Sequence, residues 1–135
     1  MQRGFENEAA LDEALSRPSA ATIELMSRLK GDILVLGVAG KMGLTLARMA
    51  VRAAQEAGVK KRVVGVARFS DADARNQLEA CGVETIQCDL LDRHAVMALP
   101  RLQNAIFMAG RKFGTGGSED VTWAMNTLVP ANVCE

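Results

Sequence analysis

The fold of this chain is decided by the stretch Ile33-Leu34-Val35-Leu36-Gly37-Val38-Ala39-Gly40-Lys41-Met42-Gly43, which a helical run from Leu44 to Ala57 follows. Residues 33–36 are all apolar, the pattern of a parallel strand that is covered on both faces. Glycines then recur at every third position. The stretch therefore predicts a buried strand, a glycine turn and the first turn of a helix.

Each glycine of this turn has a physical role. Gly37 lets the chain leave the strand in a tight turn, Gly40 has no Cβ that would keep a pyrophosphate from the backbone, and Gly43 lets the helix pack closely on the strand. The free N–H groups at the start of the helix would face the pyrophosphate, favoured by the helix dipole. The spacing G-x-x-G-x-x-G is one residue longer than the commonest dinucleotide fingerprint, and a merely structural turn is the alternative.

Composition and charge argue against several classes of protein. The chain has 135 residues, of which 49% are apolar and 24% charged, as in an ordinary domain with a real core. The formal net charge is zero, so nothing indicates nucleic acid or an anionic membrane as a partner. No apolar run approaches the ~20 residues of a membrane span.

The cysteines and the histidine indicate neither a disulfide framework nor a zinc site. Cys81, Cys88 and Cys134 are odd in number and form no C-x-x-C pair, and His94 is the only histidine. We therefore expect no metal and a cytoplasmic protein, because unpaired cysteines suit a reducing compartment.

Two segments are expected. The sequence of residues 1–30 predicts a helical arm that covers the sheet or a partner subunit. Residues 7–16 are helix-like, Arg17-Pro18 breaks this helix, and a second helix is expected to be capped by Ser19 and ended by Gly31. Residues 31–135 then predict an α/β domain.

Short apolar strands alternate with helices in the second segment. Strands are expected at 33–36, 62–67, 83–87 and 104–109. Ser70 and Asp73 resemble a capping box for the helix that ends near residue 80, while Asp92 and Ser118 are expected to cap two later helices. Such alternation predicts a Rossmann-like parallel sheet in the strand order 3-2-1-4, half of a doubly wound fold. Ligands of such sheets bind beyond the carboxyl ends of the strands, here between strands one and four.

Two charged residues follow the second and third strands. Arg68 stands where NAD-binding sites often have an acid, and an arginine can pair with the 2′-phosphate of NADP. We therefore favour NADP over NAD, although Asp71 lies close enough to weaken the argument and Arg68 could be a solvated charge. Asp89 could accept a hydrogen bond from the adenine amino group or could merely end the strand, and for Asp92 capping is the preferred role.

The fourth strand is followed by Ala109-Gly110-Arg111-Lys112. The small residues would let a ribose and nicotinamide lie against the backbone, and the two cations could meet phosphate or simply be solvated. In the last helix the amide of Asn126 could organise a site or be an ordinary polar position. Pro130 is expected to kink or end that helix.

The motifs Gly37-x-x-Gly40-x-x-Gly43, Asp89-Leu90-x-Asp92, Ala109-Gly110 and Asn126, in this order, resemble the N-terminal half of an extended short-chain dehydrogenase/reductase. This is the NAD(P)-dependent epimerase/dehydratase group, whose members often act on nucleotide sugars, and the resemblance covers roughly residues 31–135. It implies that the backbone around Lys41 and Met42 holds pyrophosphate, that Asp89 and Leu90 meet the adenine and Ala109-Gly110 the ribose, and that Asn126 is a structural residue.

The chain departs from that family in two respects. Lys41 replaces the aromatic residue that usually follows the second glycine, and the catalytic Ser and Tyr-x-x-x-Lys are missing, since the chain has no tyrosine. We therefore expect a truncated NAD(P)-binding domain from a parent of roughly 300 residues, inactive by itself. Strand four would then be an open apolar edge that favours self-association. The alternatives are a non-catalytic NADP-sensing module and an assembly piece that binds no ligand.

Overall fold

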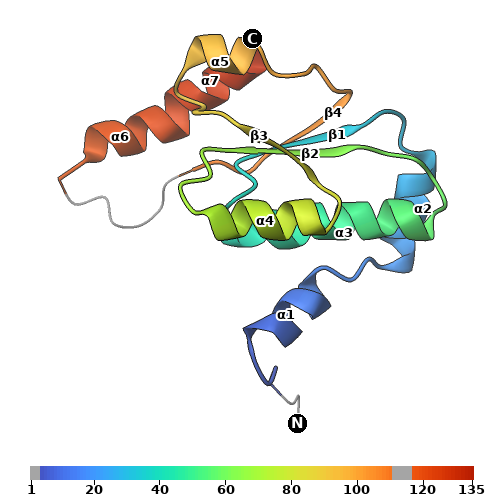
Figure 1. The fold of residues 1–135 in the computed structure, drawn as a ribbon. Helices are drawn as coiled ribbons and strands as arrows, with labels where there is room; N and C mark the ends of the chain where they lie inside the picture. Colours follow the sequence, from blue (N-terminus) through green and yellow to red (C-terminus); the bar gives the residue numbers. More distant parts are fainter. Residues whose placement is uncertain (1–3, 111–116) are drawn as a thin grey trace.

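The sheet is parallel throughout, and its strands stand in the predicted order. The computed structural model describes residues 4–110 and 117–135. Within them the sheet order is β3-β2-β1-β4, and each neighbouring pair is parallel (Figure 1). The strands are β1 (Ile33–Leu36), β2 (Val63–Ala67), β3 (Glu84–Gln87) and β4 (Asn104–Phe107). The chain is therefore an α/β protein, and its sheet is consistent with a Rossmann-like fold.

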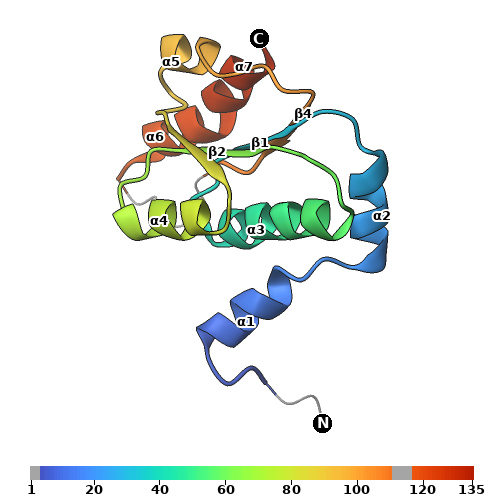
Figure 2. The same ribbon diagram turned by 45° about the vertical axis from the view of Figure 1, so that its right-hand side comes forward.

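Helices cover both faces of the sheet. The helices of the described residues are α1 (Glu8–Leu15), α2 (Ala20–Arg28), α3 (Lys41–Glu56), α4 (Ala72–Ala80), α5 (Arg93–Met97), α6 (Glu119–Trp123), the π turn η1 (Ala124–Leu128) and α7 (Val129–Cys134). Figures 1 and 2 show α3 and α4 on one face and α5 with the α6–η1–α7 helix on the other. None of the helices in the described part of the chain is both long and apolar enough to cross a membrane.

The core explains why residues 33–36 are uniformly apolar. All four residues of β1 are buried, and alternate ones point to opposite faces. Ile33 and Val35 pack with α3, whereas Leu34 and Leu36 pack with Val96 of α5 and with α7. Burying one such side chain contributes roughly 1.5–3 kcal/mol to the free energy of unfolding. Because β1 is covered on both faces, it stabilises the helical layers on both sides of the sheet.

The N-terminal arm packs on α3 rather than directly on the sheet. Glu13 of α1 forms ion pairs with Arg48 at 2.7 Å and Arg52 at 2.9 Å, and Arg52 Nη1 also donates to the buried Ser16 Oγ at 3.2 Å. The hydrogen bond from Arg52 lowers the pKa of Glu13. Met26 of α2 joins the core on the α3 side. The arm therefore extends the helical layer outward (Figure 2).

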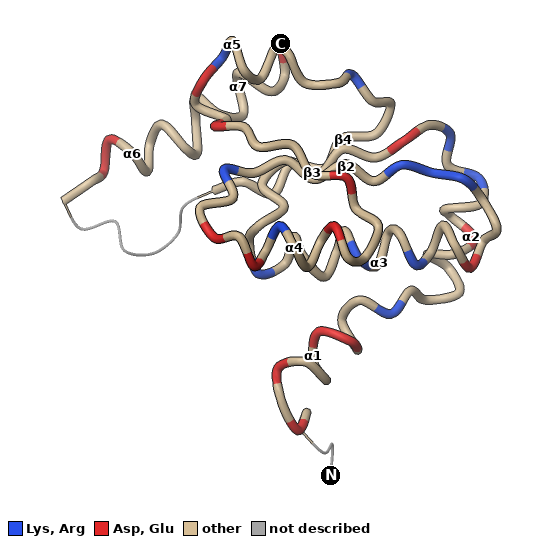
Figure 3. Tube along the Cα trace, viewed as in Figure 1, with Lys and Arg blue, Asp and Glu red and all other residues tan. Residues whose placement is uncertain are grey.

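The two edge strands of the sheet differ in charge. At the β3 edge, Glu84 accepts two hydrogen bonds of 2.8 Å from the Arg62 guanidinium. At the β4 edge, Ile106 and Phe107 are 37% and 38% exposed. Figure 3 shows β4 without a charged residue. The predicted apolar edge strand is thus present in the structure.

The last helix does not end at Pro130, so of the two predicted outcomes, a kink or an end, the end is wrong. The helix runs on to Cys134, because the turn before the proline is a π turn in which the Val129 amide donates to the Ala124 carbonyl, five residues back. The wider turn accommodates a ring that would clash in a regular helix. Ser118 precedes this helix, but its side chain makes no capping hydrogen bond.

Candidate functional site

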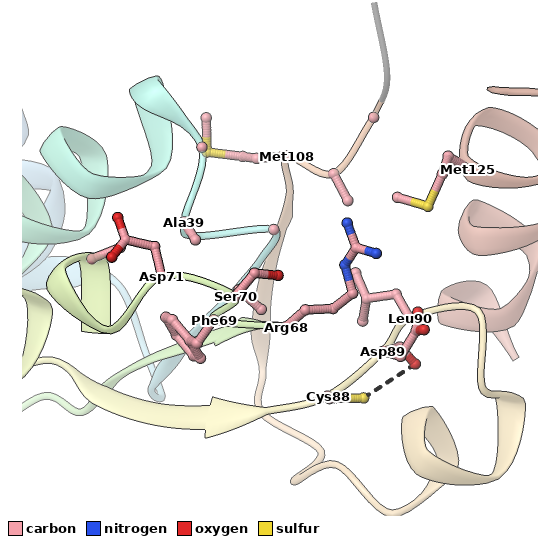
Figure 4. A pocket seen from close by; sticks show the side chains of 16 residues that line it. Ala39, Arg68, Phe69, Ser70, Asp71, Cys88, Asp89, Leu90, Met108 and Met125 are labelled. Carbon is pink, nitrogen blue, oxygen red and sulfur yellow. Dashed lines mark hydrogen bonds between the residues drawn. The ribbon is translucent and has the colours of Figure 1, made fainter. Parts of the chain in front are cut away.

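A cavity of about 370 Å³ lies at the carboxyl ends of the strands. It is bounded by the turns after β1 and β2, by the ends of β3 and β4, and by Met125 of η1 (Figure 4). The position between β1 and β4 is the topological switch point of the sheet, where the strand order reverses. The sequence predicts a ligand site at this position. The predicted residues that line the cavity are Gly37, Gly40, Arg68, Asp89, Leu90, Ala109 and Gly110.

Two of the three turn glycines are required by the fold itself. Gly37 has a φ of +84°, and a Cβ there would lie 2.5 Å from the Ala109 backbone nitrogen. A Cβ on Gly43 would lie 2.2 Å from the Val38 carbonyl oxygen. Both approaches are to backbone atoms, which cannot rotate away. These residues therefore fix how β1, α3 and β4 meet.

Gly40 is different, because no atom of the described residues crowds the space that a side chain would take. Its φ of −74° suits any residue, and the nearest atom to an added Cβ, the Gly37 carbonyl oxygen, would be 3.7 Å away. Gly40 lines the cavity. The turn is thus open on the side where a ligand would approach.

The first turn of α3, directly after Gly40, has backbone amides without acceptors among the described residues. Gly40 is the N-cap, and it has no side chain that could cap the helix. The Gly43 amide donates within the turn to the Gly40 carbonyl at 3.0 Å. The described residues provide no acceptor for the amides of Lys41 and Met42. Both residues are exposed, Met42 to 71%, but neither they nor Gly43 is among the residues that line the cavity. The start of a helix favours an anion, so the two amides remain candidates for a contact with pyrophosphate.

The turn after β2 corrects the predicted capping box at Ser70. The N-cap of α4 is Asp71, whose Oδ1 accepts from the Asp73 amide at 2.9 Å. The helix cap thus lies one residue later than expected, and it follows a turn in which Phe69 takes a left-handed conformation, with φ of +49°. Sequence reasoning did not identify Phe69 as a residue of the site, although it lines the cavity.

Arg68 presents an unpaired charge to the cavity. Its side chain extends from the end of β2 toward the opening between Ala39 and Met125 (Figure 4). Within residues 4–110 and 117–135 its guanidinium forms neither an ion pair nor a hydrogen bond. The carboxylate of Asp71 is occupied by α4 and lies on the far side of Ser70 from the guanidinium in Figure 4.

The end of β3 places a thiol and a carboxylate at the cavity. Asp89 Oδ1 accepts from the Leu91 amide at 3.0 Å, which leaves Oδ2 for another donor. Cys88 is buried, its Sγ donates to the Asp89 carbonyl at 3.6 Å, and burial raises the pKa of its thiol. Leu90 is buried against the α7 side of the core. An adenine contact at Asp89 stays a prediction.

The end of β4 brings small residues against the cavity. Ala109 and Gly110 line it, and a Cβ on Gly110 would lie 3.3 Å from Asn126 Oδ1. Asn126 is therefore beside Gly110 and does not itself line the cavity. Arg111 and Lys112, for which an anion contact was considered, lie outside the described residues. Sequence reasoning also missed Met108 and Met125, which no motif distinguishes from core residues.

Comparison with protein-family models and with curated proteins finds no match to the chain. In the part of the chain that the structure describes, no group of three or more His, Cys, Asp or Glu side chains could hold a metal ion.

Proposed function

We propose that this chain is the dinucleotide-binding part of an NAD(P)-dependent epimerase, dehydratase or reductase of the extended short-chain dehydrogenase/reductase type. The observation that carries the proposal is Gly40: the fold does not need a glycine there, yet the residue lines a cavity at the switch point of a parallel sheet. An approaching diphosphate is a physical reason for a missing side chain at that point.

The cavity supports an assignment of residues to each part of the cofactor. The amides of Lys41 and Met42 would hold the pyrophosphate beside Gly40. The free Oδ2 of Asp89 would accept from the adenine amino group, and Ala109-Gly110 would lie against a ribose. Arg68 favours NADP over NAD, because an unpaired guanidinium suits a 2′-phosphate.

The bound nicotinamide would supply hydride transfer to or from a small-molecule substrate, with nucleotide sugars as candidates. The described residues would bind and orient the cofactor. The catalytic Ser and Tyr-x-x-x-Lys of this mechanism would come from sequence outside these 135 residues, so the chain by itself is expected to be inactive.

The test is Gly40→Val, with affinity for NADPH and NADH measured by isothermal titration calorimetry. We expect both affinities to fall at least ~10-fold, because the side chain occupies the diphosphate position and the loss of even one charge-assisted hydrogen bond is worth about 1.5–3 kcal/mol. Gly4→Val is the matched control, since an added Cβ on Gly4 likewise meets no close neighbour, and Gly4 is not among the residues that line the cavity. Unchanged affinity in Gly40→Val would overturn the proposal.

The absence of tyrosine favours a second candidate, a protein that senses NADP without catalysis. The gene distinguishes the two. A Tyr-x-x-x-Lys encoded about 15 to 40 residues after Glu135, the span of one further strand and loop, supports the enzyme. A stop codon directly after Glu135, together with NADP affinity, supports the sensor.

Self-association is proposed separately, through the β4 edge. Ile106 and Phe107 are partly exposed on an edge strand without charges, which is a template for strand pairing. We expect Ile106→Lys to lower the molar mass measured by size-exclusion chromatography with light scattering. Gln87→Lys, which adds the same charge at the other edge, should not. A monomeric wild-type chain at high concentration would refute the proposal.

A further inference from the structure

We propose that a groove between the N-terminal arm and the helical layer binds a small organic amine, whose ammonium group pairs with the Asp12 carboxylate and whose apolar body lies against α3 and α4. The groove is a cavity of about 290 Å³ lined by residues of α1, α3 and α4 and by Cys81. Figures 1 and 2 show α1 beyond α3 and α4, on the side away from the sheet. Among the described residues the groove shares none with the cavity at the carboxyl ends of the strands, so this site is separate from the proposed dinucleotide function.

The helix α1 is attached to the chain by polar rather than apolar contacts. None of its residues is buried, and within the described part of the chain its apolar side chains neither belong to the two core clusters nor pack against them. Leu15 is 54% exposed. The helix is held instead by Glu13, which pairs with Arg48 and Arg52 of α3 at 2.7 and 2.9 Å. Because α1 docks through its acidic side, no apolar side chain of the arm fills the groove.

The opposite wall of the groove is apolar and belongs to the packed interior. Leu44 comes from α3, Leu78 and Ala80 come from α4, and Cys81 directly follows α4. Leu78 is 2% exposed and is a member of the core cluster on the α3 side. Small-molecule sites in proteins are typically concave and largely apolar, with a few polar groups that fix the orientation of the ligand. The groove has this composition.

Asp12 is the charged group of the groove that lacks a partner. Within residues 4–110 and 117–135 its carboxylate forms neither an ion pair nor a hydrogen bond. Arg48, the other charged residue of the groove, is paired with Glu13 at 2.7 Å. An ammonium group that enters the groove would therefore gain a carboxylate without displacing an existing partner.

The remaining polar groups favour a primary amine over an anion. The side chain of Gln77 lines the groove and has no hydrogen-bond partner among the described residues, so its carbonyl oxygen would accept a second N–H of an ammonium group, which has three. A carboxylate or phosphate in the same place would meet the unpaired Asp12. Arg17 and Arg52, the other two cations near Glu13, do not line the groove.

The first experiment compares 2-phenylethylamine, 2-phenylethanol and 3-phenylpropionate by NMR titration of the isotope-labelled chain, because the three share a phenyl ring and differ in the charge of the head group. We expect the amine to bind at least ~5-fold more tightly than the alcohol, since charge-assisted hydrogen bonds are the stronger ones, and the propionate to bind least tightly. Asp12→Asn should reduce the ratio of amine to alcohol affinity to about one. Glu8→Gln is the matched control, because it removes a carboxylate of α1 that does not line the groove, and it should keep the ratio.

The second experiment locates the bound amine through the cysteines. Cys81 lines the groove and is partly exposed, whereas Cys134 is exposed and does not line it. We expect 2-phenylethylamine to slow the alkylation of Cys81 by iodoacetamide at least ~3-fold, because a ligand at a few times its dissociation constant occupies most of the sites. Alkylation of Cys134 should stay unchanged, and peptide mass spectrometry measures both thiols in the same sample.

Three results would overturn the site. They are equal affinities of the wild-type chain for the amine and the alcohol or no binding of either, an unchanged ratio in Asp12→Asn, and alkylation of Cys81 that the amine does not slow. None of these results bears on dinucleotide binding, which Gly40→Val tests at the other cavity.

Discussion

The turns after β1 and β2 open onto the same cavity, yet they are held in place by different means. The first turn is fixed by close backbone contacts, in which Gly37 meets Ala109 and Gly43 meets Val38. The second turn has no glycine and is fixed by a strained aromatic residue, Phe69, and by the helix cap Asp71. The comparison indicates that the first turn tolerates no added atoms at these two glycines, whereas the second depends on the particular side chains that it carries.

The strongest way to break the first turn is Gly43→Ala. The new methyl group would lie 2.2 Å from the Val38 carbonyl oxygen, so the helix must move away from the strand. We expect a loss of about 3 kcal/mol in the free energy of unfolding, at the upper end for overpacking. Urea denaturation followed by circular dichroism measures it. Gly40→Ala in the same turn should cost less than about 1 kcal/mol, and equal costs for the two variants would contradict the comparison.

Gly37→Ala should have the next largest effect. Alanine there combines a φ of +84° with a Cβ 2.5 Å from the Ala109 nitrogen. We expect a loss of about 2 kcal/mol, from backbone strain and from displacement of the end of β4. Thermal unfolding by calorimetry provides the measurement. A melting temperature equal to that of the wild-type chain would show that the turn is not rigid.

The second turn is probed by Asp71→Ala against Ser70→Ala. Loss of the Asp71 cap should cost about 1 kcal/mol, because the Asp73 amide loses its acceptor. Ser70→Ala should change stability by less than about 0.5 kcal/mol, as for an exposed residue outside the helix. Both values come from chemical denaturation. If Ser70→Ala lowered the free energy of unfolding more than Asp71→Ala, Ser70 would be the cap of α4.

Gly40→Ser is expected to have a small effect on the free energy of unfolding, and it should stabilise the chain, whereas the other glycine substitutions destabilise it. A serine at this N-cap has room for its Cβ and could accept an amide of the first turn, so we expect a gain of about 0.5 kcal/mol. Dinucleotide affinity should fall, because the new side chain competes for the donors that a diphosphate needs. Stability and affinity that move in the same direction would count against a ligand-binding role for Gly40.

Patterns of apolar residues were sufficient to predict the sheet and its strand order. Residues 33–36 are apolar without interruption because both faces of β1 are covered, and that pattern is evident in the amino-acid sequence itself. The glycine spacing also located the first turn. It did not show that Gly40 alone of the three is free of internal packing, since this depends on which backbone atoms lie opposite each glycine.

The errors came from contacts that local sequence does not encode. Ser70 and Asp71 are both residue types that cap helices well, and the structure uses Asp71, in a turn where Phe69 is left-handed. Pro130 is a helix breaker by propensity, but the π turn at Ala124–Leu128 removes the clash. Met125, which is partly exposed, lines the cavity although its helix lies far from the other lining residues in the sequence. No sequence motif identifies it as a residue of the site.

The uncharged edge of β4 has a consequence for how the chain behaves as ionic strength changes. The proposed association through Ile106 and Phe107 would involve no charge, so salt screening would leave it intact, and sulfate, which is excluded from protein surfaces, would strengthen the burial of these apolar side chains. The proposed attraction of a dinucleotide to Arg68 and the α3 amides would weaken under the same conditions. Ammonium sulfate should therefore drive the chain toward assemblies while it releases nucleotide, and dilute buffer should do the reverse.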